Sequence, residues 1–381
     1  MSSPEKKKNK KKELLPTPTK NPSLPDDLLV SCLARVSRLY YPTLSLVSKR
    51  FQSLLASPEL YNARSLLGHT ENFLYVCLGI YPCFLWYTLR RKPDQTLTSD
   101  TSQVEKSSGY ILTPVPVPHS TRVKFSGLVA VGSNIYNIEE HSSSVSILDC
   151  MSHTWREAPS LRVKLSSLSA SVVDQKIYVA GMREKDEGSF KNSFEVLDKK
   201  THIRDPEPIP CSETKCRFFC PKTASIDGKF HVINGREVDQ VVAYNAKKST
   251  WDVVEGVMNR YMHPYSTYCV IEDILYSACY GVFRWYDTKL RMWRCLKGLV
   301  GLPKFSLDAH VRLADYGGKM TVFWKDDLPR PRSVYEKKIC CAVIALERRN
   351  VCEIWGKVEW CDHVYTVPEL YDLVKVLAVT I

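Results

Sequence analysis

A pattern that returns every 42 to 53 residues constrains the fold of this 381-residue chain more than any other feature. The pattern is a short run of aromatic and β-branched residues, and it follows a turn signal such as Asp227-Gly228-Lys229 each time. Such runs favour strands, and repeats of about 40 to 50 residues with room for four strands are typical of β-propellers. The runs lie at 135–138, 177–180, 230–233, 275–278 and 320–323, and a related run lies at 73–79.

A second feature keeps the same spacing, because an Asp or Asn stands six residues before a Trp in several repeats. The Asx residue favours a tight turn, and the Trp that follows supplies a large apolar surface between sheets. Chance rarely aligns two independent features at one period, so the repeat is a strong signal. The pairs are Asp149 and Trp155, Asn245 and Trp251, and Asp287 and Trp293; Asp198 is followed by Arg204 instead, and Trp355 is expected in the last repeat.

These features predict a mainly β fold, a six-bladed propeller over residues 72–381, with five or seven blades as the alternatives. The third blade illustrates the expected pattern, with strands at 168–173, 176–181, 193–198 and 203–209. We expect the blades near 73–118, 124–160, 165–210, 218–257, 265–300 and 308–362.

The first of these blades lacks an innermost strand, and the end of the chain can supply it. Residues 373–381 form a run that we interpret as apolar on both faces, as an inner strand should be. We therefore expect this run to pair with 73–79 and close the ring, and we expect 92–108 to form an exposed loop.

Residues 23–67 have a helical pattern instead, with three short helices expected in a small all-α domain. Acidic residues after Pro25 favour the first helix start, and Ser57 with Pro58 marks the third. Apolar residues at helical spacing from Pro42 to Leu55 predict one continuous second helix. A domain this small makes a poor core alone, so it is expected to dock on a partner.

Charge and cysteine content narrow the class of protein. The net charge is +12, but residues 1–20 hold seven Lys against two Glu, and no basic stripe with interleaved aromatics follows, so nucleic-acid binding is not expected. The chain lacks a secretory signal, a membrane-spanning run and any C-x-x-C pair, which favours the nucleus, the cytoplasm or both. Residues 1–22 predict a disordered tail, in which 6–12 is either a nuclear-import signal or a solvated segment.

Metal and catalytic chemistry are not expected, and no cofactor is predicted. Cys211, Cys216, Cys220 and His231 do not match the spacing of paired zinc ligands. No hydrolase or metalloprotease motif is present, and we interpret His153, His231 and His310 as structural. A propeller enzyme stays as a minor alternative.

Residues 24–67 resemble an F-box through LPDDLL, CLARV at 32–36 and YPTLSLVSKRF at 41–51. The later repeats resemble kelch repeats, although the glycine doublet is reduced to Ala180-Gly181 and Asn234-Gly235 and is absent after 275–278 and 320–323. F-box followed by kelch is similar to a large plant F-box/kelch-repeat family. The resemblance implies that the F-box binds a SKP-family adaptor, linked to a cullin-RING ubiquitin ligase, and that the propeller binds an unknown protein substrate. A non-degradative scaffold is the alternative.

The resemblance also implies two sets of site residues. Adaptor binding is assigned to Leu24, Pro25, Leu28, Leu29, Leu44, Val47, Ser48 and Phe51, although Leu44 and Val47 could equally pack the domain's own helices. Substrate binding is expected on the loops that join the second and third strands of the blades, because rigid scaffolds carry function on such loops. These loops are 139–144, 182–192, 234–240, 279–282 and 325–337. Their Arg and aromatic residues are typical of interface hot spots, and the basic character favours an acidic or phosphorylated partner segment. The residues are Arg183, Lys185, Phe190, Arg236, Tyr280, Arg330 and Arg332.

Overall fold

The computed structural model divides the chain into two compact units, Met1–His69 and Thr70–Ile381. No helix in the described part of the chain is long and apolar enough to cross a membrane. The predicted tail at 1–22 and most of the predicted loop at 92–108 lie outside the described residues. The structure describes residues 24–92, 109–117, 123–184, 190–198, 221–234, 241–262, 266–307, 309–327 and 336–381.

The first unit is helical, and its helices begin where the sequence supplies the right residues. Asp26 and Asp27 open the first helix, where acidic side chains favour the helix dipole. The Ser57 hydroxyl accepts a hydrogen bond from the Leu60 amide at 3.4 Å and caps the last helix, as predicted. The elements are α1 (Asp26–Leu33), η1 (Arg38–Tyr40), α2 (Tyr41–Ser45), α3 (Lys49–Leu55) and α4 (Pro58–Leu66).

The prediction of one continuous helix from Pro42 to Leu55 was wrong, because the helix is interrupted before Ser48. α2 ends at Ser45, and α3 begins at Lys49. Ser48 has an extended backbone, with φ −166° and ψ 161°, which no helix interior allows. Its hydroxyl accepts a hydrogen bond from the Phe51 amide at 3.2 Å and so caps α3. The apolar residues keep helical spacing across this interruption, so the periodicity of the sequence alone did not reveal that the helix ends there.

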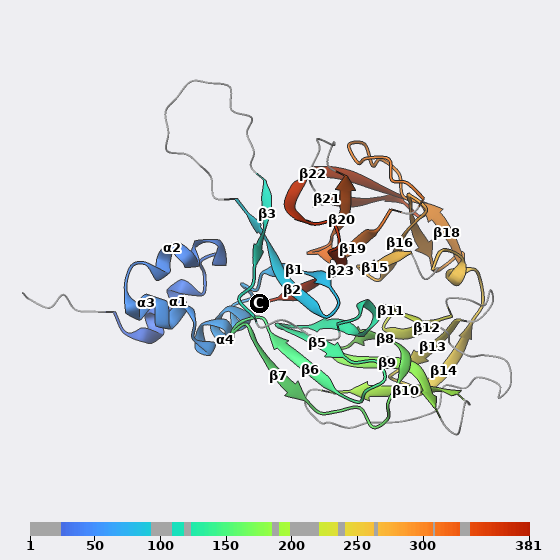
Figure 1. Ribbon diagram of the computed structural model, residues 1–381, viewed down its shortest axis with the longest axis horizontal. Coiled ribbons are helices and arrows are strands. Elements are labelled where there is room, and N and C mark those ends of the chain that lie inside the picture. The colour runs from blue at the N-terminus through green and yellow to red at the C-terminus, as the bar shows by residue number, and fades with distance from the viewer. Residues whose placement is uncertain are drawn as a thin grey trace, which may run out of the picture. The chain divides into compact units, whose positions relative to one another are not determined.

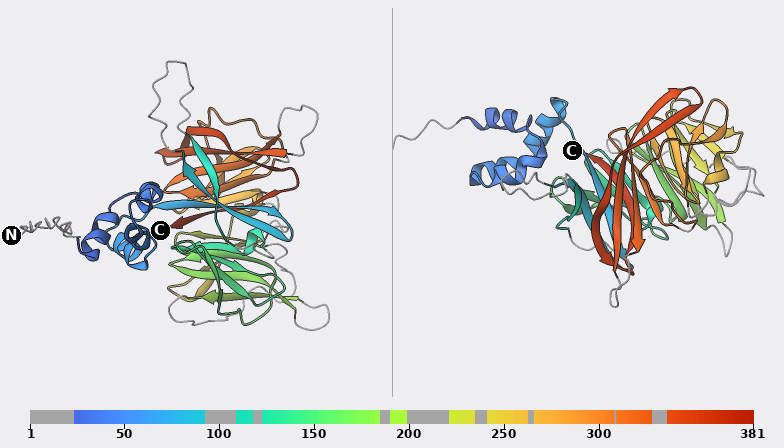
Figure 2. Two further views of the ribbon diagram at one scale, coloured as in Figure 1. Left: turned by 60° about the vertical axis from the view of Figure 1, so that its left-hand side comes forward. Right: turned by 90° about the horizontal axis from the view of Figure 1, so that it is seen from above.

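The second unit consists of six antiparallel sheets arranged around a common centre (Figure 1). Four strands are described in five of the sheets, and three are described in the third sheet, whose predicted fourth strand at 203–209 lies outside the described residues. Figure 2 shows the same sheets from two further sides. The six-bladed propeller is therefore confirmed.

Blades one to three contain the following strands. Blade one has β23 (Asp372–Thr380), β1 (Asn72–Ile80), β2 (Cys83–Arg91) and β3 (Tyr110–Pro114). Blade two has β4 (Leu128–Val131), β5 (Asn134–Ile138), β6 (Val145–Asp149) and β7 (Thr154–Ala158), preceded by η2 (Phe125–Gly127). Blade three has β8 (Ser166–Val173), β9 (Lys176–Glu184) and β10 (Phe190–Leu197).

Blades four to six complete the ring. Blade four has β11 (Lys222–Ile226), β12 (Lys229–Ile233), β13 (Val241–Asn245) and β14 (Thr250–Val254), followed by η3 (Met258–Tyr261). Blade five has β15 (Thr267–Ile271), β16 (Ile274–Cys279), β17 (Val282–Asp287) and β18 (Met292–Cys295). Blade six has β19 (Val311–Tyr316), β20 (Lys319–Asp327), β21 (Glu336–Asn350) and β22 (Glu353–Pro368).

The end of the chain closes the ring by supplying the innermost strand of blade one. β23 pairs antiparallel with β1, and Tyr75 lies opposite Leu377. The Glu71 amide donates to the Ile381 carbonyl at 2.8 Å, and the Ile381 amide donates to the Glu71 carbonyl at 2.9 Å. The inner strands β23, β4, β8, β11, β15 and β19 each contact the next around the ring.

The Asx residues of the repeat form the turns that the sequence predicts. The Asp149 carboxylate accepts hydrogen bonds from the Met151 and Ser152 amides, at 2.8 and 3.3 Å. The Asp287 carboxylate and the Asn245 side-chain carbonyl accept equivalent bonds at 3.1 to 3.3 Å. Each turn delivers the following Trp to the outermost strand of its blade, where Trp251 lies opposite Tyr244 and Trp293 lies opposite Tyr286.

Candidate binding surfaces

The helical unit exposes apolar side chains at the starts of α1 and α3. Leu24 is 56% exposed, Leu28 49% and Val47 63%. Arg50 of α3 donates to the Asp26 carboxylate at 2.7 Å and to the Leu24 carbonyl, so the two helix starts are held together. We call Leu24, Pro25, Leu28, Leu46 and Val47 the helical-unit surface.

A buried arginine holds the helices beneath this surface. Arg64 of α4 donates from Nη1 to the Val36 carbonyl at 2.6 Å and to the Tyr41 hydroxyl at 3.1 Å. The Tyr41 hydroxyl in turn donates to the Leu33 carbonyl at 3.1 Å. Burial raises the pKa of Tyr41, although the nearby Arg64 charge opposes that rise. The network joins α1, α2 and α4, and so gives a small unit a defined shape.

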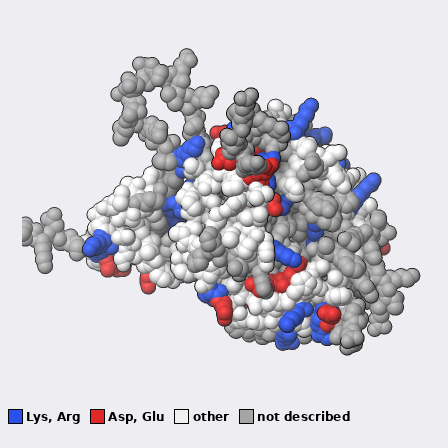
Figure 3. All heavy atoms as spheres, viewed as in Figure 1, with Lys and Arg blue, Asp and Glu red and all other residues white. Residues whose placement is uncertain are grey.

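The loops that join second and third strands lie at one end of the propeller, and three of them are described in full, one being the Tyr81-Pro82 turn of blade one. Residues 139–144 join β5 to β6, and Tyr280 with Gly281 makes a two-residue turn from β16 to β17. Tyr280 has φ 52° and is exposed. On the face in Figure 3, basic and acidic side chains are mixed. Ion pairs occur in the propeller, such as the one between Lys229 Nζ and Asp252 Oδ2, which lie 2.9 Å apart.

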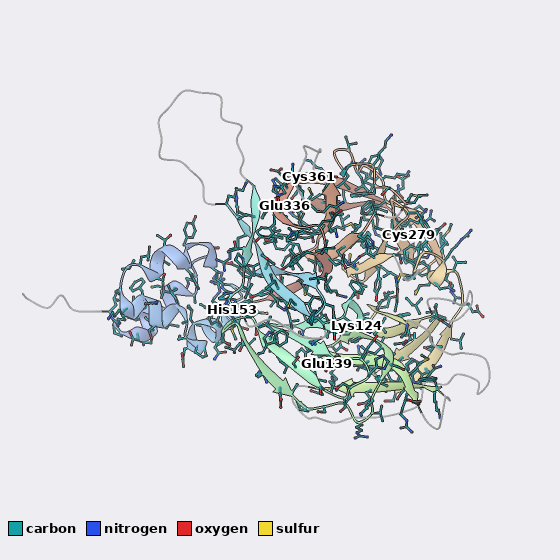
Figure 4. The ribbon with its side chains drawn as sticks, viewed as in Figure 1. Lys124, Glu139, His153, Cys279, Glu336 and Cys361 are labelled. Atoms are coloured by element: carbon teal, nitrogen blue, oxygen red, sulfur yellow. The ribbon has the colours of Figure 1, made fainter. Side chains whose placement is uncertain are left out.

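A cavity of about 610 Å³ lies where the inner strands of the propeller begin. Its lining comes from five of the six blades, at the starts of β8, β11, β15 and β23 and at η2 and the β5–β6 loop. Lys124, beside η2, lies close to the middle of the ring (Figure 4) and forms an ion pair with Glu140. We call this space the central cavity; its lining includes Lys124, Phe125, Glu140, His141, Ser169, Lys222, Tyr268 and Val374.

Two family models match the chain over separate segments. The F-box domain matches residues 22–63, and the FKB95, Kelch-repeats domain matches residues 86–365. The chain belongs to the F-box/kelch-repeat family.

Full-length relatives of the protein come from Arabidopsis thaliana. F-box/kelch-repeat protein At5g51250 is 57% identical over 372 residues, which cover 94% of this chain and 100% of the relative. F-box/kelch-repeat protein At4g39550 is 50% identical over 401 residues and covers both chains completely. F-box/kelch-repeat protein At3g06570 is 53% identical and covers 94% of this chain and 93% of its own. The order of F-box and kelch propeller is thus shared along the whole chain.

The eight F-box residues assigned to adaptor binding fall into two groups. Leu24, Pro25, Leu28, Val47 and Ser48 are exposed. Leu29 is buried, and Leu44 and Phe51 are half-buried against the F-box core of Leu33, Ala34, Tyr41, Leu55 and Leu60. Leu44 and Phe51 therefore support the surface from beneath.

Sequence reasoning passed over Leu46, which is 84% exposed. In the single helix that we predicted, Leu46 lies well away from the face that carries Leu44 and Val47. Because the helix is interrupted before Ser48, Leu46 does not have to lie on the opposite face from Leu44 and Val47. The LSLV run at 44–47, which contains three apolar residues next to a cap, was the signal that could have identified Leu46.

The residues assigned to substrate binding are only partly described. Lys185, Arg236, Arg330 and Arg332 lie outside the described residues. Arg183 and Phe190 were expected in a loop at 182–192, but Arg183 lies in β9 and Phe190 in β10. The ladder between these strands continues to the pair of Glu184 and Phe190, so this loop is shorter than predicted.

Of the histidines weighed for catalysis, His231 and His153 have polar neighbours in the structure, and His310 is exposed. Burial lowers the pKa of His231 to about 4, and its Nδ1 lies 3.3 Å from the Lys229 carbonyl. His153 Nε2 lies 3.2 Å from the Tyr75 hydroxyl in a turn. Among the described residues, no group of three or more His, Cys, Asp or Glu side chains could hold a metal. Cys211, Cys216 and Cys220 lie outside them.

Proposed function

We propose that this protein is the substrate-recognition subunit of an SCF-type ubiquitin ligase. Its F-box binds a SKP-family adaptor, through which it joins a cullin-RING ligase, and its kelch propeller binds the protein to be ubiquitinated. In this role the chain itself is a non-catalytic receptor. The observation that carries the proposal is the exposed helical-unit surface on an F-box of this family.

Exposed apolar groups gathered at one place favour a protein partner. The helical-unit surface brings together apolar side chains from the starts of two helices, each about half exposed or more. Clustered apolar exposure on a small domain typically marks an interaction site. The Arg50 contacts to Asp26 and Leu24 hold the surface in one arrangement before binding, which lowers the entropic cost of association.

The propeller supports the substrate-binding half of the proposal by its topology. The chain enters the propeller at Asn72, at the opposite end of β1 from the turn into β2. That turn is the blade-one equivalent of the loops that join second and third strands in the other blades. Asn72 therefore lies at one end of the ring, while these loops and the central cavity occupy the other.

Direct capture of a purified SKP-family adaptor tests the F-box half of this proposal. Leu28→Asp with Val47→Asp places two charges on the helical-unit surface without touching the F-box core. We expect a loss of adaptor capture of more than tenfold, since a central interface anchor typically contributes roughly 2 kcal/mol or more. Val253→Asp, at a 73% exposed propeller valine, is the matched control and should bind normally. Equal capture by the double variant and the control would remove the basis of the proposal.

A further inference from the structure

Two cationic side chains converge on one aromatic ring beside the central cavity. Phe125 lines the cavity, and the Lys375 Nζ of β23 lies 3.6 Å from the centre of its ring. The Arg312 guanidinium of β19 lies 5.1 Å from the same ring centre. The two strands are neighbours around the ring, so both charges approach this lining residue from adjacent blades.

A third cation, Lys222, lines the cavity from the start of β11. Its Nζ donates to the Ser266 carbonyl at 2.8 Å and to the Ser266 hydroxyl at 2.9 Å, and it lies 5.2 Å from the Tyr268 ring centre. Arg312 is also held in place, because its Nε donates to the Val374 carbonyl at 3.0 Å. The inner strands thus fix these two cations through neutral groups.

The charges of Arg312 and Lys222 both act on Lys375. Burial, together with the positive charges of Arg312 and Lys222, lowers the pKa of Lys375 to about 7. Burial also lowers the pKa of Arg312, and the carboxylate of Asp372 opposes that shift. The Asp372 Oδ1 atom lies 3.5 Å from the Lys325 Nζ atom, and Glu140 at the cavity forms an ion pair with Lys124. Each of these carboxylates is therefore paired with a cation outside the set of Lys375, Arg312 and Lys222.

We propose that the central cavity binds a phosphate or carboxylate group through Lys375, Arg312 and Lys222. Three cations from three inner strands supply the charge, and the hydroxyls of Ser169 and Tyr268 on the lining supply further polar contacts. A volume of about 610 Å³ admits such a group together with the chain or molecule that carries it. The inference deepens the proposed function, on which it rests for the expectation that this end of the propeller meets the substrate.

An anion bound here would reverse an unfavourable arrangement of like charges. Placing a negative charge between the three cations favours the protonated form of Lys375, whereas the cavity without an anion disfavours it. Charge-assisted hydrogen bonds from Lys and Arg to phosphate or carboxylate are about twice as strong as neutral ones. The geometry therefore favours anions over neutral ligands of the same size.

Calorimetric titration of the full chain with inorganic phosphate, at constant ionic strength, tests this inference. The key variant is Lys375→Met, which removes one cation and keeps the length of the side chain. Lys357→Met is the matched control, because it removes the same charge from an exposed position on β22. We expect saturable binding to the wild type and to the control, and at least tenfold weaker binding to Lys375→Met.

Melting temperatures in phosphate and in chloride give a second readout that does not depend on the heat of binding. Phosphate should raise the melting temperature of the wild type and of Lys357→Met more than that of Lys375→Met. Lys375→Met is expected to fold, because it removes a buried charge that lies near two others. Absence of saturable binding to the wild type, or equal binding by Lys375→Met, would overturn the inference.

Two peptide arms distinguish the source of the anion. A short phosphoserine peptide that binds at least as well as inorganic phosphate, while its serine counterpart does not, supports the site and assigns it to a partner segment. Tighter binding of inorganic phosphate than of the phosphopeptide supports the site and assigns it to a small ion. Adaptor capture is measured on the same protein, so loss of phosphate binding alone leaves the ligase proposal standing.

Discussion

The F-box and the propeller differ in what they leave open to a partner. The F-box gathers exposed apolar side chains such as Leu28 and Val47 at two helix starts. The propeller instead places Lys222 on the lining of the central cavity, and Arg312 and Lys375 against the lining residue Phe125. Apolar contact suits one constant partner, because it depends on fitted shape. Charged contact suits choice among partners, because like charges exclude the wrong ones.

The two units also differ in how their stability is built. The F-box core is a cluster of five buried apolar residues, so a partner that covered its surface would add substantially to its stability. The propeller instead forms a series of clusters between adjacent blades, and its ring is closed by strands 300 residues apart in the chain. The propeller should therefore be sensitive to loss of closure, and the F-box to loss of caps and partner.

The largest effect is expected from removing the closing strand. In a chain that ends at Tyr371, β1 loses its inner neighbour β23 and keeps only β2, so the buried side chains of Leu74, Val76 and Leu78 face an open edge. Such an edge invites aggregation, so we expect the cooperative melting transition of the propeller to disappear. Size-exclusion chromatography and thermal melting measure this. A chain that starts at Ser23 is the control, and if the chain that ends at Tyr371 melts as the control does, the ring does not depend on closure.

A second prediction separates the two surfaces by their response to salt. Raising the ionic strength from 0.1 to 1 M shortens the screening length from about 10 to about 3 Å, which weakens interactions between charges. Phosphate binding to the propeller should fall by more than tenfold, while adaptor binding to the helical-unit surface should change by less than about threefold. Titrations at both salt concentrations decide this. A parallel fall in both affinities would mean that the F-box surface also acts through charge.

The smallest effect concerns the Ser48 cap, which belongs to the F-box alone. Ser48→Ala removes the hydrogen bond from the Phe51 amide, and should lower the stability of the F-box by about 1 kcal/mol. Ser53→Ala, on the exposed side of α3, is the control and should have little effect. Hydrogen exchange of the α3 amides, compared with amides of β1, measures the change. Faster exchange in β1 as well would show that the two units are not energetically separate.

The sequence predicted the propeller well because its signals are local and repeated. Asp149, Asn245 and Asp287 make their turns with amides two and three residues away, so each turn can be recognised from a few residues. The F-box helix starts at Asp26 and Ser57 are local in the same sense. Features of this kind do not depend on which distant segments meet.

The candidate sites could be predicted less well, because they depend on non-local packing. Leu28 and Leu29 are adjacent in the sequence, yet one is exposed and the other buried. Lys375 lies in a run interpreted as apolar on both faces, and its role emerges only when β23 lies beside β19 and Phe125 covers the lysine. β9 and β10 are longer than predicted and include Arg183 and Phe190. Predicting this length would likewise have required the register in which the two strands pair.

The most direct test of the account is the amount of ubiquitin on proteins that co-purify with the chain while the proteasome is blocked. The wild type is compared with Leu28→Asp/Val47→Asp, which alters the F-box and leaves the propeller intact. The account predicts that the double variant retains the propeller-bound proteins but loses the adaptor, the cullin and the ubiquitin conjugates. Equal ubiquitin on those proteins with both chains would contradict it, and the F-box would then serve an assembly that does not ubiquitinate its cargo.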